Sequence, residues 1–210
     1  MALKKGDFVE IEFTGKIKDT GEIFDSNIPE DLKKIDSKKK PEPYVFALGE
    51  KMFLKAIDDF LIGKSEEKKE YTLELPPEKA FGKRDSNKIN LIPMKIFKQQ
   101  GTMPQTGMMF NFDGKLAKIL SVSGGRVMVD FNNPVAGKDV VYKIKLLGKI
   151  TDKKEKVRAF NKFLFGKDVE FEIKDKKIIV KLDKQLAKLG NAFKKKYKDI
   201  FGMDLEVKEI

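Results

Sequence analysis

The sequence predicts an α+β fold, because segments with a two-residue hydrophobic period alternate with short segments of helical period. Val9, Ile11 and Phe13 alternate with glutamates and predict a half-buried strand. Residues 53–61 place apolar side chains at helical spacing, and Gly63 ends that pattern. Hairpin turn signals separate several of these segments, which predicts antiparallel pairing between strands.

Three further strands, a turn and a loop are predicted from the same kinds of signal. Alternation predicts strands at residues 44–48, 71–75 and 140–146. The run Asp19-Thr20-Gly21-Glu22 is typical of a hairpin turn. Residues 29–43 are rich in lysine, flanked by prolines and without an apolar period, so we predict a surface loop there.

The character of the sequence changes after residue 86. Residues 91–97 predict a helix of one or two turns, with a proline near its start. Asp113-Gly114 and Gly124-Gly125 are strong hairpin signals. They bracket a predicted strand over residues 115–122, and a second strand follows over residues 127–131.

The last part of the chain has the pattern of a separate unit. Asp152 and Glu155 form a capping box, which predicts the start of a helix. A hairpin is predicted over residues 169–182 and a second helix over residues 184–201. The alternating tail, residues 205–210, predicts a final strand.

Composition excludes several classes of function. The 210 residues include no cysteine, histidine or tryptophan, which removes disulfide frameworks and most nucleophilic and metal chemistry. No apolar run approaches the roughly 18 residues that a membrane span needs. The first residues lack the apolar core of a secretory signal. We therefore expect a cytoplasmic protein that binds neither membranes, metals nor other cofactors.

The net charge of +11 suggests a nucleic-acid partner. Only Arg84, Arg126 and Arg158 are arginines among the 44 basic residues, however, and arginine makes the bidentate contacts that read guanine. The lysines are spread along the chain, which favours a solvated surface over a phosphate-binding track. A basic RNA- or ribosome-associated module stays open as an alternative, which a steep loss of binding with salt would support.

Five motifs occur in a fixed order and identify a resemblance. They are Phe13-Thr14-Gly15, Gly21-Glu22-Ile23-Phe24-Asp25-Ser26, Pro43-Tyr44-Val45-Phe46-Ala47-Leu48-Gly49, Ala80-Phe81-Gly82 and Asn133-Pro134-Val135-Ala136-Gly137. In order and spacing the chain resembles the FKBP-type peptidyl-prolyl cis-trans isomerases, in particular the SlyD-like long class with archaeal members that carry an extra C-terminal domain. Any one motif alone would be weak evidence for this resemblance.

The resemblance implies a particular architecture. We expect an FKBP-like antiparallel half-barrel sheet around a short helix, with an inserted small, mostly-β domain and a C-terminal α+β domain. The isomerase domain would comprise residues 1–86 and 131–151, the insert-in-flap chaperone domain residues 87–130, and the C-terminal domain residues 152–210.

The chemistry implied is rotation about an X–Pro amide, which needs no covalent step. The barrier is about 18–20 kcal/mol because twisting the bond destroys amide resonance. The resemblance places these residues around an apolar pocket: Phe13, Phe24, Asp25, Tyr44, Phe53, Leu54, Ile57, Phe81 and Tyr142. Asp25 would make a polar contact to the substrate backbone and would not act as an acid or base.

The chain departs from the family pattern in three ways. Ile57 stands where many relatives have a tryptophan at the floor of the pocket. Phe13 and Phe81 stand where relatives have tyrosines, so two hydroxyl groups are missing. These changes bear on the affinity for macrolide inhibitors more than on isomerisation. The histidine-rich metal-binding tail of SlyD relatives is absent.

The insert is rich in methionine, whose flexible thioether repacks around different apolar segments. We therefore expect it to bind unfolded or proline-containing polypeptides. The expected client-binding residues are Met94, Ile96, Phe97, Met103, Met108, Met109, Phe110 and Met128. A competing explanation is that some of these side chains fill the core of a small domain.

Two further questions stay open at the level of sequence. A binding-only chaperone with a decayed isomerase site is an alternative to the enzyme, favoured by Phe13 and Phe81 and opposed by Asp25. The alternating tail with Leu205 and Val207 would form an exposed sheet edge. We therefore expect a homodimer formed through the C-terminal domain.

Overall fold

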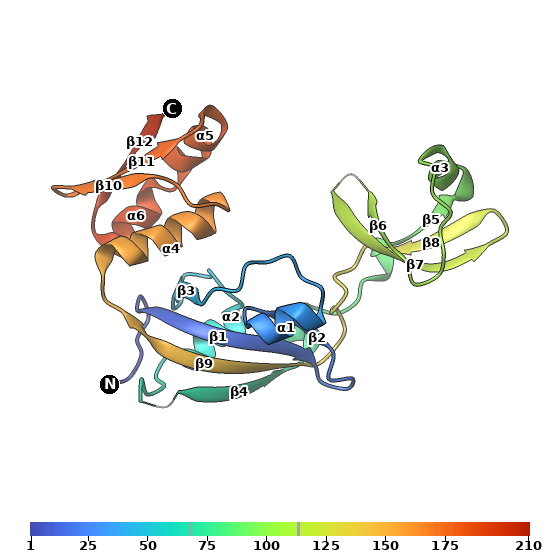
Figure 1. Cartoon of the computed structure of the whole chain (residues 1–210), viewed down its shortest axis with the longest axis horizontal. Coiled ribbons are helices and arrows are strands. Elements are labelled where there is room, and N and C mark those ends of the chain that lie inside the picture. Colours follow the sequence, from blue (N-terminus) through green and yellow to red (C-terminus); the bar gives the residue numbers. More distant parts are fainter. Residues whose placement is uncertain (68, 113) are drawn as a thin grey trace. The chain divides into compact units, whose positions relative to one another are not determined.

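The computed structural model describes residues 1–67, 69–112 and 114–210 (Figure 1). The chain forms two compact units. One contains residues 1–15, 25–73 and 142–210, and the other contains residues 16–24 and 74–141. Among the described residues, no helix combines the length and the apolar character needed to cross a membrane.

The first sheet has five strands and confirms the FKBP-like sheet of the predicted α+β fold. Its strands are β1 (Phe8–Ile17), β2 (Ile23–Ser26), β3 (Tyr44–Ala47), β4 (Glu70–Leu75) and β9 (Val140–Ile150). They follow the order β2-β1-β9-β4, and β3 pairs antiparallel with β1. Burial follows the predicted alternation, because Val9, Ile11 and Phe13 are buried while the glutamates between them are partly exposed.

A short helix, α1 (Pro29–Lys34), shows that the surface loop predicted for residues 29–43 was wrong in its first part. Proline starts the helix, acidic residues follow in its first turn and lysines end it, which suits the helix dipole. Leu32 is its only buried residue. Six residues with one buried side chain show no apolar period, so the sequence pattern missed this helix.

The second helix, α2 (Lys55–Leu61), lies where helical spacing predicted it. Ile57 and Leu61 are completely buried, and Leu54 is the N-cap residue. Gly63 follows with φ +85°, a left-handed conformation that glycine adopts without strain.

The insert forms its own four-stranded sheet in the order β5-β8-β7-β6. Its elements are β5 (Ile89–Pro93), α3 (Met94–Gln99), β6 (Met109–Phe112), β7 (Lys115–Ser123) and β8 (Arg126–Asp130), after short 3-10 turns at Pro77–Lys79 and Ser86–Lys88. Leu91 and Ile92 lie in β5, so the helix predicted from residue 91 begins only at Met94.

Glycine turns join the strands of the insert as the sequence predicted. Gly124 and Gly125 both have positive φ, +54° and +75°, between β7 and β8. This is the conformation that a tight two-residue hairpin requires. Of the other predicted pair, Gly114 also has positive φ, whereas Asp113 lies outside the described residues.

The C-terminal part holds a three-stranded sheet in the order β10-β11-β12 and three helices (Figure 1). Its elements are α4 (Lys153–Phe165), β10 (Phe171–Lys174), β11 (Lys177–Leu182), α5 (Lys184–Ala192), α6 (Lys194–Phe201) and β12 (Asp204–Glu209). The capping box appears in part, because the Asp152 carboxylate accepts a hydrogen bond from the Glu155 N–H at 2.8 Å.

The single helix predicted for residues 184–201 is two helices that meet at Phe193. The break re-aims the second helix so that Tyr197 is completely buried, with its ring 5.2 Å from that of Phe160. The Tyr197 hydroxyl donates to the side chain of Asn161. The break therefore accompanies the tertiary packing of this tyrosine, which helical periodicity alone does not reveal.

The C-terminal elements pack against the first sheet within the same unit. Helix α4 lies against β3, and Lys162 of α4 forms an ion pair with Glu42. The rings of Phe8 and Phe201 lie 5.9 Å apart. Strand β12 is an edge of its sheet, as the sequence suggested. Homodimerisation through it stays a prediction.

Candidate active site

An aromatic cluster forms where the first sheet meets the segment before α2. Phe13 comes from β1, Tyr44 from β3 and Tyr142 from β9. The centroid of the Phe13 ring lies 4.9 Å from that of Phe53, 6.2 Å from that of Tyr142 and 6.5 Å from that of Tyr44. Phe46 was not among the expected pocket residues, but its ring centroid lies 5.6 Å from those of both Tyr44 and Phe53. The fold thus brings together four of the expected pocket residues.

The cluster has a buried layer and an accessible layer. Phe13, Ile57 and Tyr142 are buried. Tyr44, Phe53 and Leu54 are partly exposed. A ligand would therefore contact the second group first, while the first group fixes the shape beneath it. Ile57 of α2 contributes an aliphatic side chain to that buried layer.

Asp25 lies at the end of β2 and forms an ion pair with Lys39, at 2.9 Å. Both side chains are partly or largely exposed. Lys39 is the cation that pairs with this carboxylate. Lys39 was missed in the sequence because it is one of three consecutive lysines, with nothing to distinguish it from its neighbours.

Asn27 and Ser26 hold the segment that carries Asp25 against β1. The Asn27 side chain accepts from the Phe13 N–H at 2.7 Å and donates to the Ile11 carbonyl at 2.9 Å. Ser26 donates from its hydroxyl to the Phe13 carbonyl at 2.8 Å. Asn27 directly follows the Phe24-Asp25-Ser26 motif, but it was not among the expected site residues.

Both tyrosines of the cluster stay protonated near neutral pH. Burial, helped by the carboxylates of Asp58 and Asp25, raises the pKa of Tyr44 to about 12. Burial and Asp25 likewise raise the pKa of Tyr142. The Tyr44 hydroxyl donates to the Met52 carbonyl at 2.5 Å, so it serves to fix the ring. The cluster is an apolar surface with phenol donors and one carboxylate.

A second carboxylate, Asp58, lies in α2 and is almost completely buried, at 1% exposure. Its Oδ2 accepts from the backbone N–H groups of Gly49 and Lys51 at 3.2 and 3.3 Å. Its Oδ1 has no hydrogen-bond partner among the described residues. Burial raises the pKa of Asp58 to about 6, although the two backbone bonds oppose that shift.

We expect Asp58→Asn to stabilise the protein at neutral pH. The folded-state pKa of about 6 lies above the ordinary value of 3.8, so stability from the protonated carboxyl is present at low pH and is lost as pH rises through 6. The variant should gain about 1–3 kcal/mol over wild type at pH 7, and this gain should shrink as the pH falls from about 6 to about 4. Urea unfolding from pH 4 to pH 8 measures the difference.

Asp59→Asn is the matched control for that experiment. Asp59 is the next residue in α2, is largely exposed and pairs with Lys55. Its substitution should change stability little at any pH. An Asp58→Asn gain that does not vary with pH would contradict the role given to the buried charge.

Two expected pocket residues lie in the other unit. Phe24 of β2 and Phe81 contact each other edge to face, with ring centroids 5.4 Å apart. Both are partly exposed. Phe81 follows the turn at Pro77–Lys79, and Gly82 after it has φ +77°. The motif Ala80-Phe81-Gly82 therefore presents an aromatic ring beside a backbone position suited to glycine.

The residues expected to bind clients divide into core and surface. Phe97 is completely buried at the centre of the insert core, and Met94 and Phe110 pack against it. The others have exposed side chains: Ile96, Met103, Met108, Met109 and Met128. Leu91 and Leu116 are also exposed, although they were not among the expected client-binding residues. Each alternates with a neighbour that faces the insert core, the partly buried Ile92 or the buried Ala117, and this alternation was the signal that could have found them.

Comparison with known proteins identifies the family. Residues 1–98 match the family described as FKBP-type peptidyl-prolyl cis-trans isomerase, and residues 90–135 match that described as FKBP26, IF domain. The short-type peptidyl-prolyl cis-trans isomerase of Methanocaldococcus jannaschii is 33% identical over 147 residues, which are 69% of this chain and 92% of that protein. The chain belongs to the FKBP-type peptidyl-prolyl cis-trans isomerases.

Two further relatives of this FKBP-type isomerase are bacterial. The FKBP-type isomerase SlyD of Helicobacter pylori is 29% identical over 147 residues, 66% of this chain and 70% of that protein. A probable FKBP-type 16 kDa isomerase of Pseudomonas fluorescens is 27% identical over 118 residues, 54% of this chain and 77% of that protein. The resemblance drawn from the motifs is confirmed, including the insert.

Proposed function

We propose that this FKBP-type isomerase twists X–Pro amides over the aromatic cluster around Phe13 and captures unfolded clients on one face of its insert. The observation that carries the second part is a row of exposed apolar side chains on a sheet face opposite the insert core. The first part rests on family membership and on the cluster geometry.

The aromatic cluster suits a rotation that needs no acid, base or nucleophile. A twisted amide has less charge separation than a planar one, so an apolar surface that excludes water favours the twisted form. The rings of Tyr44 and Phe53 supply the accessible part of that surface. We assign to Asp25 a hydrogen bond from a substrate backbone N–H, made when the substrate displaces the exposed Lys39 from the carboxylate.

Strand register defines the outer face of the insert sheet. Met128 lies between Val127 and Val129, which are both completely buried, so its side chain points to the opposite face. Leu91 is its direct partner on β5 and shares that face. Met109 lies opposite Lys118, next to the pair of Asn111 with Leu116. This outer face, Leu91, Met109, Leu116 and Met128, carries apolar side chains that the insert core does not use.

Such a face fits many different clients. Methionine is unbranched and polarisable, so its side chain adapts to apolar segments of different shape. Met103, Met108 and Ile96 add exposed apolar area on the same insert. Exposed apolar patches rimmed by polar residues mark interaction sites on soluble domains. We therefore assign client capture to the surface of the insert, while Phe97 and its neighbours maintain the fold.

A double substitution, Met109→Lys with Met128→Lys, tests client capture. Two charges on the outer face should raise the concentration of protein needed to suppress aggregation of a reduced, unfolded client by about tenfold, because an unpaired charge resists burial against apolar chain. Turnover of a four-residue Ala–Pro peptide should stay within about threefold of wild type. Light scattering of the client and a protease-coupled peptide assay measure the two effects.

Leu189→Lys is the matched control for that pair. Leu189 lies on α5, outside the insert, and is 57% exposed. Its substitution replaces an exposed apolar residue by lysine and should leave aggregation suppression unchanged. Equal loss in the control and the double variant would mean that the outer face has no special role.

A further inference from the structure

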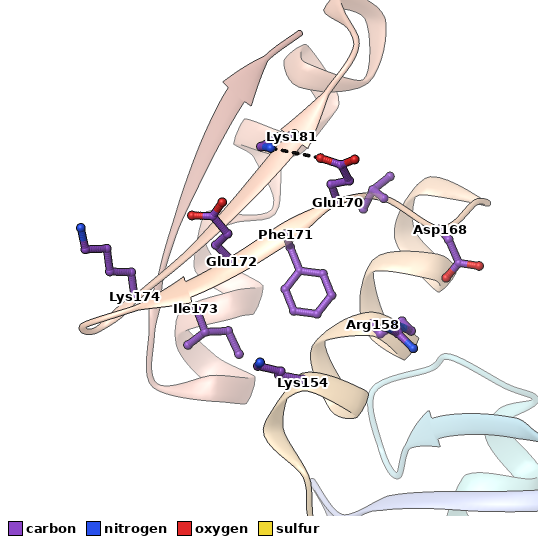
Figure 2. Close-up of a pocket in the computed structure, with 10 residues that line it drawn as sticks. Lys154, Arg158, Asp168, Glu170, Phe171, Glu172, Ile173, Lys174 and Lys181 are labelled. Carbon is purple, nitrogen blue, oxygen red and sulfur yellow. Dashed lines mark hydrogen bonds and ion pairs between the residues drawn. The ribbon is translucent and has the colours of Figure 1, made fainter.

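A cavity of about 800 Å³ follows one edge of the C-terminal sheet (Figure 2). It is lined by the six consecutive residues from Val169 to Lys174, which face Lys154 and Arg158 of α4. Successive side chains of a strand point to opposite faces of its sheet. A cavity that all six residues line therefore runs along the backbone edge of β10, and not over one face of the sheet.

The backbone of that edge has free hydrogen-bonding groups. β10 is the outermost strand of the order β10-β11-β12 among the described residues. The Lys181 N–H donates to the Glu170 carbonyl at 2.9 Å, and the antiparallel register pairs Glu172 with Ile179. In this alternation Glu170 and Glu172 direct their backbone groups to β11, so Phe171 and Ile173 direct theirs outward, into the cavity.

The cavity also has an apolar wall. Phe171 pairs with Val180 and Ile173 with Ile178, and both partners are completely buried, so Phe171 and Ile173 lie on the inner face of the sheet. Both are only partly buried there. Figure 2 shows the Phe171 ring pointing from β10 toward α4, beside Arg158. An added strand would find backbone partners at the edge and apolar contacts on one side.

A second cavity shares lining residues with the first and borders one residue of the aromatic cluster. It measures about 810 Å³ and lies between β3 and α4, lined by Tyr44 and its neighbours on one side and by Ala159 and Phe163 on the other. Arg158 and Asp168 line both cavities. Tyr44 is also a member of the aromatic cluster. The two cavities are therefore neighbours at Arg158 and Asp168, and the second also borders Tyr44.

We propose that the C-terminal domain is a second client-binding site, in which an extended client segment adds as a strand to β10. The client segment would run from the aromatic cluster past Tyr44 and along α4 to β10. The inference rests on the proposed position of the isomerase site. An extended polypeptide is the occupant because the edge offers main-chain groups, which any sequence can pair, and because the neighbouring cavity borders Tyr44 of the proposed isomerase site, whose substrate is a polypeptide.

Peptides with and without a tail test the proposal. The short probe is a four-residue peptide with one Ala–Pro bond, and the long probes add about 12 residues of alternating valine and serine, up to about 40 Å when extended. One long probe carries the tail before the proline and one after it. Full-length wild type should turn over one of the two long probes with a kcat/KM about tenfold higher than for the short probe. The reason is that a tail bound at β10 raises the local concentration of the Ala–Pro bond at the isomerase site.

Backbone methylation of the tail then identifies strand addition. N-methylating alternate tail residues in one of the two possible phases should remove the gain, and the other phase should leave it, because only one set of N–H groups faces β10. Loss of the kcat/KM gain with both methylation phases, or with neither, would overturn the proposal. So would a wild type that turns over the short probe and gains nothing from either tail.

The variant Ile173→Pro tests the same edge from the side of the protein. The Ile173 N–H faces outward, so proline there removes a donor from the free edge without breaking a bond to β11. The tail gain should disappear while kcat/KM for the short probe stays unchanged, and thermal unfolding should confirm an intact fold. A retained gain would overturn the proposal, as would a wild-type dimer that this variant converts to monomer. If wild type did not turn over the short probe, that result would count against the proposed isomerase site and not against the β10 site.

Discussion

Removal of the insert is expected to abolish catalysis of protein refolding while leaving the turnover of short peptides intact. Ile89 and Asp130 are direct cross-strand partners, so their Cα atoms lie close enough for a short loop to join them. Replacing residues 90–129 by a four-residue glycine-serine loop keeps Asp130, which forms an ion pair with Arg84 at 2.6 Å. Asn132 is also kept; its side chain accepts a hydrogen bond from the Asp85 N–H and donates one to the Asp85 carbonyl.

The size of the effect follows from avidity. On the proposed function, a client held on the insert would meet the aromatic cluster at high local concentration, and the loss of that tether should lower refolding catalysis by about a hundredfold. Turnover of a four-residue peptide should stay within about threefold, because such a peptide does not need the tether. Refolding of a proline-limited protein and a protease-coupled assay measure the two. Unchanged refolding would assign the insert methionines to core packing.

The substitution Asp25→Ala should lower kcat/KM on an Ala–Pro peptide by about tenfold, equivalent to about 1.4 kcal/mol. This is the size of one hydrogen bond to a charged acceptor. The phenols of Tyr44 and Tyr142 stay protonated and do not replace a carboxylate acceptor. The loss should be independent of pH between 6 and 9, because the carboxylate acts as an acceptor and transfers no proton.

Lys39→Ala is the control that separates the carboxylate from its ion pair. It removes the partner of Asp25 and leaves the acceptor in place. Its kcat/KM should equal or slightly exceed that of wild type, because the substrate no longer competes with the lysine. If wild type, Asp25→Ala and Tyr142→Ala were equally inactive on peptides, the binding-only chaperone would be the better description.

Local sequence pattern predicted most of the secondary structure because most elements have a strong period. The long strands β1 and β9 alternate over many residues, and α4 has a capping carboxylate at Asp152. The pattern failed where elements are short or where distant packing intervenes. Helix α1 buries only Leu32, and the break between α5 and α6 accompanies the burial of Tyr197.

The order of the motifs was enough to predict the family, and with it the aromatic residues of the cluster. The sequence contained no comparable signal for Lys39 as the partner of Asp25. That pairing depends on how a lysine-rich segment folds back over the sheet. The same holds for Asn27, whose side chain bonds to the backbone of β1 at Phe13 and Ile11.

The sequence by itself thus determined the α+β class, the family and the residue types of the site, because these depend on period, composition and motif order along the chain. Only the tertiary structure decided which methionines are exposed, since Met94 and Met128 belong to the same apolar pattern but lie in the core and on the outer face. It alone revealed the free edge of β10 beside α4. Burial and unpaired backbone groups depend on neighbours distant in sequence, and no local pattern records them.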